Sequence, residues 1–306
     1  MAHPDARLIE HRGGSAPSQT PHNAPADRAT AFGRPRDFLG NRFVYLTISP
    51  RARGLCAGVN LNPDKYCNFD CVYCEVDRLT APKETHLDVA TMADELRRTL
   101  AWIESGEIAR HPLYANVPAN LLELRGVVLS GDGEPTLSPQ FADAVRAVIH
   151  LRASGGSPRF KIILVTNATG LDLPEVEESL GLLNNSDEIW AKLDVGSQGY
   201  MNHINRGQAS LAKILTNIRT LACRRPVIIQ SLFCDLAGKK PSESEIADYI
   251  GRLNELKTSG AQIPLVQIYS AIRPISSAGC RHLSLKLLSE IARAVRKNTG
   301  LQAEIF

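Results

Sequence analysis

Short apolar runs and amphipathic segments alternate along most of this chain. The apolar runs are rich in Val, Ile and Leu, which is typical of strands buried on both faces. Between them, apolar residues recur every three or four positions, which predicts helices with one buried face. Strands are predicted at residues 43–48, around 59–61, and at 126–130, 161–166, 188–194, 227–233 and 265–269, with a short terminal strand within 301–306. Helices are predicted at 92–103, 141–151, from about 174 onward, around 211–218, 246–253 and 287–295.

Three of these helices carry start signals. Thr91 is expected to cap the helix at 92–103, with Asp94 three residues further on. Pro174 suits the first turn of the helix that it opens. Ser242 and Glu245 have the spacing of a capping box, in which each side chain bonds to the backbone of the other.

The order of these elements predicts the fold class. Apolar strands that alternate with amphipathic helices indicate βαβ units and a parallel sheet. Six core strands are expected, counting the one at 59–61 that precedes a cysteine-rich loop at about 62–82. Periodicity alone does not separate a partial (β/α)6 barrel from a doubly wound sheet. The basic residues 51–54 are expected to form a loop before the first core strand.

The first 38 residues differ in composition from the rest. They are rich in Pro, Ala, Gly, Ser and His and lack periodicity, which predicts a disordered N-terminal arm. Arginines in the arm could recruit a substrate, but acidic residues offset most of their charge. No linker divides the remainder, so residues 39–306 are expected to form one domain.

Composition narrows the class of protein. The chain has 306 residues with 43% hydrophobic and 22% charged content, which is ordinary for a globular protein. Its net charge of +3 neither demands nor excludes a nucleic-acid partner. It contains no apolar run of membrane-spanning length and no apolar signal-peptide core at its start. Seven cysteines, three of them grouped, fit a reducing compartment, so a cytoplasmic protein without a membrane partner is expected.

The grouped cysteines are the strongest chemical signal. Cys67, Cys71 and Cys74 have C-x3-C-x2-C spacing, and clustered thiolates suit zinc or an iron–sulfur cluster. A structural zinc site and an electron-carrying four-iron cluster both need four protein ligands. Three cysteines hold three irons and leave the fourth open to another ligand. The alternative is a zinc site completed by Cys56 or His86.

This motif, with the aromatic Tyr73 before its last cysteine, resembles the signature of the radical S-adenosylmethionine (SAM) superfamily. The wider block at residues 59–76 is similar to the wyosine-synthetase-like Fe–S oxidoreductases. The resemblance implies a partial (β/α)6 TIM-type barrel with parallel strands. It also implies a [4Fe–4S] cluster on Cys67, Cys71 and Cys74 whose open iron is chelated by SAM. An electron then cleaves SAM to methionine and a 5′-deoxyadenosyl radical, which abstracts a hydrogen atom from the substrate.

The residues after the strand at 126–130 resemble a second motif of that family. Gly131, Asp132, Gly133 and Glu134 are similar to its "GGE" motif, which holds the amino group of SAM. Asp132 stands between the glycines, so the match is loose. Read without the family, the same glycines predict a tight βα turn that lets backbone approach a ligand.

Other polar residues follow the later strands, where parallel α/β folds gather functional groups. Asn167 resembles a residue that contacts the ribose or methionine portion of SAM in relatives, and its alternative is a turn cap. Arg206 resembles an arginine of the family and is a candidate for the carboxylate of SAM or for substrate; its alternative is a surface arginine. Lys192 and Asp194 should point to one side and bind SAM or a substrate carboxylate, or pair with each other. His203 is expected in a loop. Arg273 resembles a feature of the family, and the sequence assigns it no role. Cys223, Cys234 and Cys280 are expected to be buried thiols.

The predicted function is that of a radical SAM enzyme with an unidentified substrate. A tRNA base leads by resemblance, and a peptide, a partner protein or a small metabolite stay open. Wyosine synthetases use three further cysteines upstream for a second cluster, and only Cys56 precedes Cys67 here, so wyosine formation is in doubt. No flavodoxin-like domain is visible, so a separate flavodoxin or ferredoxin should supply the electron. The alternatives are a non-catalytic zinc or Fe–S module and a radical SAM activase of a partner protein.

Overall fold

The computed structural model describes residues 31–32, 38–155, 159–271 and 279–306. Most of the expected N-terminal arm, and Arg273, lie outside these residues. Phe38 is buried against Trp102 and Tyr114, and the carbonyl of Ala31 accepts a hydrogen bond from the amide of Ile48 at 2.8 Å. These two residues near the end of the expected arm therefore pack on the folded domain.

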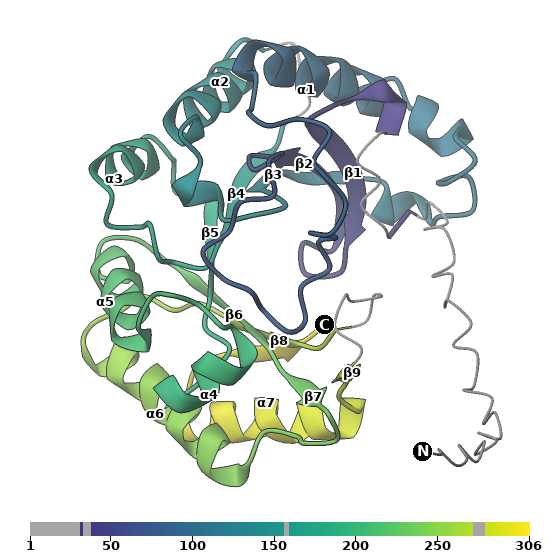
Figure 1. The fold of residues 1–306 in the computed structure, drawn as a ribbon. Coiled ribbons are helices and arrows are strands. Elements are labelled where there is room, and N and C mark those ends of the chain that lie inside the picture. The colour runs from purple at the N-terminus through teal and green to yellow at the C-terminus, as the bar shows by residue number, and fades with distance from the viewer. Residues whose placement is uncertain (1–30, 33–37, 156–158, 272–278) are drawn as a thin grey trace, which may run out of the picture.

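A curled sheet of eight strands forms the centre of the molecule (Figure 1). Its strands, in spatial order, are β1 (Val44–Ser49), β2 (Gly54–Asn60), β3 (Leu124–Ser130), β4 (Lys161–Thr166), β5 (Glu188–Lys192), β6 (Ile228–Leu232), β8 (Val266–Tyr269) and β10 (Ala303–Ile305). All neighbouring pairs are parallel except β1 with β2. The six strands from β2 to β8 are the expected core strands, so the prediction of a partial TIM-type barrel is confirmed.

Helices cover the outer face of this arc, and the loop after β2 lies on its inner side (Figure 1). They are α1 (Val89–Glu104), α2 (Phe141–Ala153), α3 (Pro174–Gly181), α4 (Gln198–Ile204), α5 (Leu211–Ala222), α6 (Glu243–Thr258) and α7 (Leu285–Thr299). In the described part of the chain, none of the helices has both the length and the apolar character to cross a bilayer.

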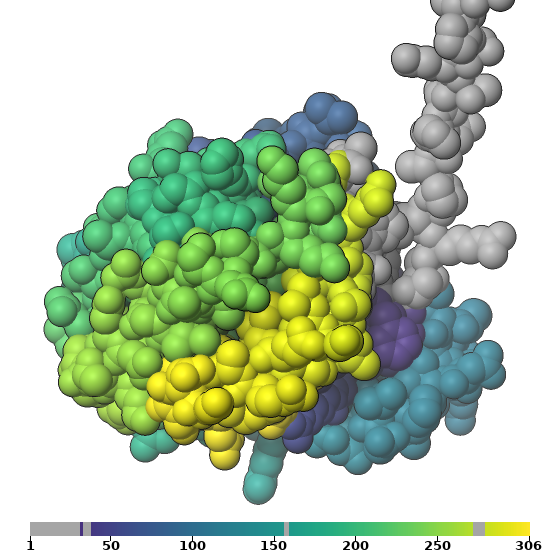
Figure 2. Space-filling model, turned by 90° about the horizontal axis from the view of Figure 1, so that it is seen from below, coloured from purple at the N-terminus to yellow at the C-terminus, as the bar shows by residue number. Residues whose placement is uncertain are grey.

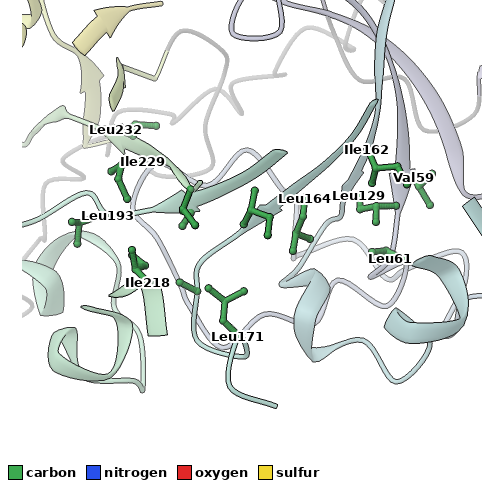
Figure 3. Packing of buried hydrophobic residues seen from close by; sticks show 14 of the residues in the cluster. Val59, Leu61, Leu129, Ile162, Leu164, Leu171, Leu193, Ile218, Ile229 and Leu232 are labelled. Carbon is green, nitrogen blue, oxygen red and sulfur yellow. The ribbon is translucent and has the colours of Figure 1, made fainter. Parts of the chain in front are cut away.

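Side-chain alternation divides each strand between a core and a cavity. On the outer face, residues such as Val59, Leu129, Leu164 and Ile229 are fully buried against the helices, and Ile218 of α5 lies near Leu193 and Ile229 (Figure 3). Residues of opposite parity point into the barrel and line a cavity, among them Ser130, Val165, Lys192 and Tyr269. The outer face therefore supplies stability, and the inner face is available for chemistry.

Three details differ from the sequence-based expectation. β2 begins at Gly54, whereas the prediction started this strand at Val59. Small residues in the first half of the strand left no apolar run from which to predict it. Asp88, not Thr91, caps α1 by accepting a hydrogen bond from the amide of Thr91 at 2.9 Å. One helix and two strands were missed, namely α4 and a small antiparallel pair formed by β7 (Cys234–Leu236) and β9 (Cys280–His282).

The capping box of α6 is only half formed. Ser242 caps the helix by accepting from the amide of Glu245 at 3.1 Å. The Glu245 carboxylate turns instead to the loop after β5, where it accepts from the amide of Gly196 and the hydroxyl of Ser197. Glu245 thus ties α6 to the segment that leads into α4.

The β1–β2 turn reaches across the open side of the half-barrel. Arg53 in this turn pairs with Glu304 of β10 at 2.6 Å. Figure 2 shows the same proximity, with the yellow C-terminal residues beside the purple start of the sheet. The first and last strands of the sheet are therefore neighbours at this point, although the ladder does not close.

Candidate functional site

A cavity of about 270 Å³ lies on the inner face of the sheet. At one end are Cys67, Cys71 and Cys74, with the Gly131–Glu134 turn beside them. At the other end are residues of β1 and the β1–β2 turn, including Thr47 and Arg51, together with Tyr269 of β8. The cavity therefore runs from the cysteine motif into the interior of the half-barrel.

The cysteine loop is held by α4, the helix that the sequence did not reveal. The amide of Asp70 donates to the carbonyl of Asn205 at 3.1 Å, and the amide of Val72 donates to the carbonyl of Ile204 at 2.9 Å. Both acceptors belong to the C-terminal end of α4, where carbonyl groups have no partner within the helix. The two bonds from the cysteine loop therefore also satisfy these carbonyls. The loop is thereby fixed against the barrel at the level of its cysteines.

Each of the three motif sulfurs accepts an N–H group. The donors are the amide of Phe69 to Cys67 at 3.4 Å, the side-chain amide of Asn205 to Cys71 at 3.6 Å, and Arg78 to Cys74 at 3.9 Å. Burial raises the pKa of the thiol to about 11 for Cys67 and to about 12 for Cys71. An N–H donor favours a thiolate, and hydrogen bonds to sulfur set the potential of iron–sulfur clusters. These surroundings fit a group whose own positive charge keeps the thiols deprotonated.

The proposed extra zinc ligands do not join the three motif cysteines. Cys56 lines the same cavity but belongs to an apolar cluster with Ile163 and Trp190, four residues or about 13 Å of strand before the end of β2. His86 is exposed and does not line the cavity. Among the described residues, no three His, Cys, Asp or Glu side chains are arranged around a single metal ion. A four-iron cluster binds each cysteine at a different iron, so it does not require such convergence.

The Gly131–Glu134 turn braces the cysteine loop. A Cβ on Gly133 would overlap the carbonyl of Tyr66, the residue before the first motif cysteine. A Cβ on Gly131 would lie 2.7 Å from the side-chain oxygen of Asn62. The amide of Glu134 donates to the carbonyl of Tyr66 at 3.2 Å. The glycines are thus required where the chain packs against itself, beside the lining of the cavity.

Glu134 and Asn167 join two strand ends. The Glu134 carboxylate accepts from the amide of Asn167 at 2.6 Å and from the hydroxyl of Thr166 at 2.5 Å. Burial raises the pKa of Glu134, although these donors oppose the shift. The Asn167 side chain in turn donates to the Asn68 side chain at 2.9 Å, within the cysteine loop. Asp132 is held by the Asn60 side-chain amide at 2.9 Å. All of these residues except Asn60 and Asn68 line the cavity.

Asp194 is buried and joins three parts of the chain. Its carboxylate accepts from the Tyr73 hydroxyl, from the Asn205 side-chain amide at 2.8 Å and from the amide of Leu232 at 2.8 Å. It also pairs with Lys192 at 3.5 Å, as the alternation of side chains predicted. Asp194 does not line the cavity, and therefore positions Tyr73 and Lys192, which do.

Other expected residues lie outside the cavity. Arg206 is about half-exposed, has a left-handed φ of 48°, and pairs with Asp70 at 3.8 Å, on the outer side of the cysteine loop. His203 belongs to the last turn of α4 rather than to a loop, and it is exposed. The expectation of buried thiols holds for Cys234 and Cys280, but Cys223 is exposed and that expectation was wrong.

The sequence-based reading missed the far end of the cavity. The missed residues are Tyr45, Thr47, Arg51 and Trp190, of which only Trp190 lies in a predicted core strand. The available signal was alternation, since residues of this parity point inward along each strand. The contribution of β1 was hidden because its apolar run gives no sign of which face meets a cavity.

Neither a protein-family model nor a curated protein sequence matches the chain. Among solved structures, TYW1 with a lysine-pyruvate adduct bound is similar at 15% sequence identity and a TM-score of 0.54, covering 85% of each chain. A radical SAM methyltransferase from Sphaerobacter thermophilus is similar at 14% identity and a TM-score of 0.62, covering 87% of this chain and 70% of the other.

Streptococcus suis SuiB bound to S-adenosylmethionine is similar at 14% identity and a TM-score of 0.53. That match covers 80% of this chain and 49% of SuiB. At such low identities, these likenesses establish that the chain has the fold of radical SAM proteins.

Proposed function

We propose that this protein is a radical SAM enzyme, in which Cys67, Cys71 and Cys74 hold a [4Fe–4S] cluster with one iron left for SAM. The observation that supports this most directly is the set of three N–H donors, one to each motif sulfur, at the mouth of a cavity in a radical SAM fold. When bound, the cluster supplies the electron that splits SAM into methionine and a carbon radical. A separate donor of flavodoxin or ferredoxin type would reduce it.

The chain's own residues would orient the cofactors and exclude water. The Gly131–Glu134 turn is the candidate for the amino group of SAM, because it lines the cavity beside the cysteines. Its side-chain oxygens at Asp132 and Glu134 are acceptors suited to an ammonium group. Tyr73, whose hydroxyl is engaged by Asp194, offers a fixed ring wall beside the cysteines.

A small molecule fits this site better than an RNA base. Between residues 62 and 80, the loop that surrounds the cysteines has four acidic side chains (Asp64, Asp70, Glu75, Asp77) against two basic ones (Lys65, Arg78). A nucleic acid is bound mainly through cationic contacts to its phosphates. The net negative charge of this loop therefore argues against RNA, which the family resemblance had put first.

The test compares single cysteine variants after anaerobic reconstitution with iron and sulfide. We expect C67A, C71A and C74A each to lose the cluster absorbance and the dithionite-dependent release of 5′-deoxyadenosine from SAM. The matched control is C223A, which removes an exposed cysteine remote from the motif in sequence and should keep both. A motif variant that still cleaves SAM would refute the proposal.

A C56A variant tests the zinc alternative in the same experiment. If the protein were a zinc module completed by Cys56, the C56A variant would lose its metal along with the motif variants. We expect C56A to retain iron and sulfide, because the thiol lies in the apolar cluster with Ile163 and Trp190. Metal analysis of the purified variants measures their zinc, iron and sulfide content. One zinc and no iron would support the zinc alternative.

A further inference from the structure

The Tyr269 end of the cavity is built around the ring of Tyr269 and adjoins the cysteine motif through Lys192, whose ammonium also lies 4.9 Å from the centre of the Tyr73 ring. The Arg51 guanidinium lies over this ring, 4.2 Å from its centre. The Lys192 ammonium donates to the Tyr269 hydroxyl at 3.0 Å and lies 5.4 Å from the same ring centre. Two cations, one from the β1–β2 turn at the edge of the sheet and one from β5 in its interior, thus meet at one phenol.

Charge is unevenly distributed along the cavity wall. Glu75, Asp132 and Glu134, the acidic residues that line it, belong to the cysteine loop and to the turn that braces it, where Arg78 is the one lining cation among the described residues. Arg51 and Lys192 lie at the Tyr269 end. Asp194 compensates Lys192 from behind and does not line the cavity. The Tyr269 end therefore presents two cationic side chains to whatever enters it.

A polar atom on β1 lacks a partner at this end. Thr47 lines the cavity and is 8% exposed, yet its hydroxyl oxygen has no hydrogen-bond partner among the residues that the structure describes. A buried hydroxyl without a partner costs free energy, so such atoms usually meet water or a ligand. Tyr45 and Ser49, which lie two residues before and after Thr47 on β1, line the cavity with it.

An apolar surface adjoins these polar groups. Trp190 lies two residues before Lys192 on β5 and shares its inward face, and its indole N–H is already bonded to Glu188 at 2.8 Å. Leu232 and Val165 also line the cavity. A ligand that fits both features has an apolar or planar body and one anionic group.

We propose that the Tyr269 end of the cavity is the substrate site, and that it takes a small molecule whose carboxylate or phosphate lies between Arg51 and Lys192. The description of this ligand as the substrate rests on the proposed function, whereas the binding of an anion does not. A guanidinium binds a carboxylate or phosphate through two parallel N–H bonds, and Lys192 and the Thr47 hydroxyl supply further donors. Trp190 would pack against the body of the ligand.

The experiment measures binding of benzoate and of its neutral analogue benzamide to the reconstituted full chain by isothermal titration calorimetry. Benzoate and benzamide differ in charge but hardly in shape, so the difference between their affinities measures the contribution of the anionic group. We expect benzoate to bind at least tenfold more tightly than benzamide. R51Q should abolish this preference. R53Q is the matched control, because Arg53 lies in the same turn but pairs with Glu304 outside the cavity, and it should keep the preference.

Repeating the titration with saturating SAM distinguishes the two possible sources of the anion. A substrate site binds benzoate in the presence of SAM, whereas a site for SAM's own carboxylate loses benzoate by competition, which would overturn the proposal. Equal binding of benzoate and benzamide would overturn it as well. The cysteine variants described above test radical chemistry separately, so anion binding without SAM cleavage would refute the proposed function and leave the anion site standing.

Discussion

At the scale of single residues, the buried carboxylate of Asp194 determines the charge of its neighbour Lys192. Burial on its own lowers the pKa of Lys192, but the Asp194 carboxylate and Tyr269 outweigh it, so the pKa of Lys192 is raised and the side chain stays charged. Alternation along the strand predicted that Lys192 and Asp194 would share a side. It could not predict the bonds of Asp194 to Tyr73 and Asn205, since these come from segments more than a hundred residues before and eleven residues after it.

The D194N substitution keeps the size of the side chain and removes the charge that compensates Lys192. Breaking a buried ion pair on one side leaves an uncompensated charge, so the free energy of unfolding should fall by about 3 kcal/mol. Urea denaturation measures it. Adding K192M to D194N should recover a large part of the loss, because the remaining charge is gone. A double variant no more stable than D194N would show that the pair is not what stabilises this region.

At the scale of elements, the cysteine loop depends on parts of the chain remote in sequence. The motif itself is local and could be identified from Cys67, Cys71 and Cys74 alone. Its anchoring by α4 could not, because α4 is only seven residues long and has too few apolar positions to show a period. For the glycines of the Gly131–Glu134 turn, the sequence supported two interpretations, the approach of a ligand and a tight turn, and it could not predict that the Tyr66 carbonyl occupies the space beside Gly133.

G133A should therefore damage the site more than the fold. An added methyl group would displace the backbone at Tyr66, beside Cys67, so we expect iron retention after reconstitution to fall several-fold while the cooperative unfolding transition persists. G251A is the matched control, since nothing lies within 4 Å of the position of its new Cβ in α6. In a helix interior it should stabilise the protein by about 0.5–1 kcal/mol and leave iron content unchanged. Full iron loading of G133A would contradict the bracing role.

At the scale of the whole molecule, the fold was predictable and the cavity was only partly so. Apolar runs and helical periods gave the βα order because every core strand packs its outer face on helices, which leaves a strong pattern. The inner face is a mixture of polar, aromatic and small residues whose identity follows from what enters the cavity. Thr47 and Arg51 thus carried no readable signal until β1 was seen to turn its inner face toward Tyr269.

SAM binding should stabilise the whole domain if the proposed function is correct. A ligand at a hundred times its dissociation constant stabilises the native state by about 2.7 kcal/mol, which corresponds to roughly 5 °C in Tm for a domain of this size. Differential scanning calorimetry of the anaerobically reconstituted protein measures this shift. The C67A variant, lacking the cluster, should show little of it. An equal shift in both proteins would mean that SAM binds independently of the cysteines.

The hairpin of β1 and β2 has a consequence for how such a protein could diversify. Its turn furnishes Arg51 to the Tyr269 end of the cavity, yet it precedes the cysteine motif in the chain, and Phe69, Asn205 and Arg78, which donate to the three sulfurs, belong to other segments. A lineage could therefore exchange this short segment and acquire a new preference for its reactant, while the cysteine motif and its donors are inherited unaltered.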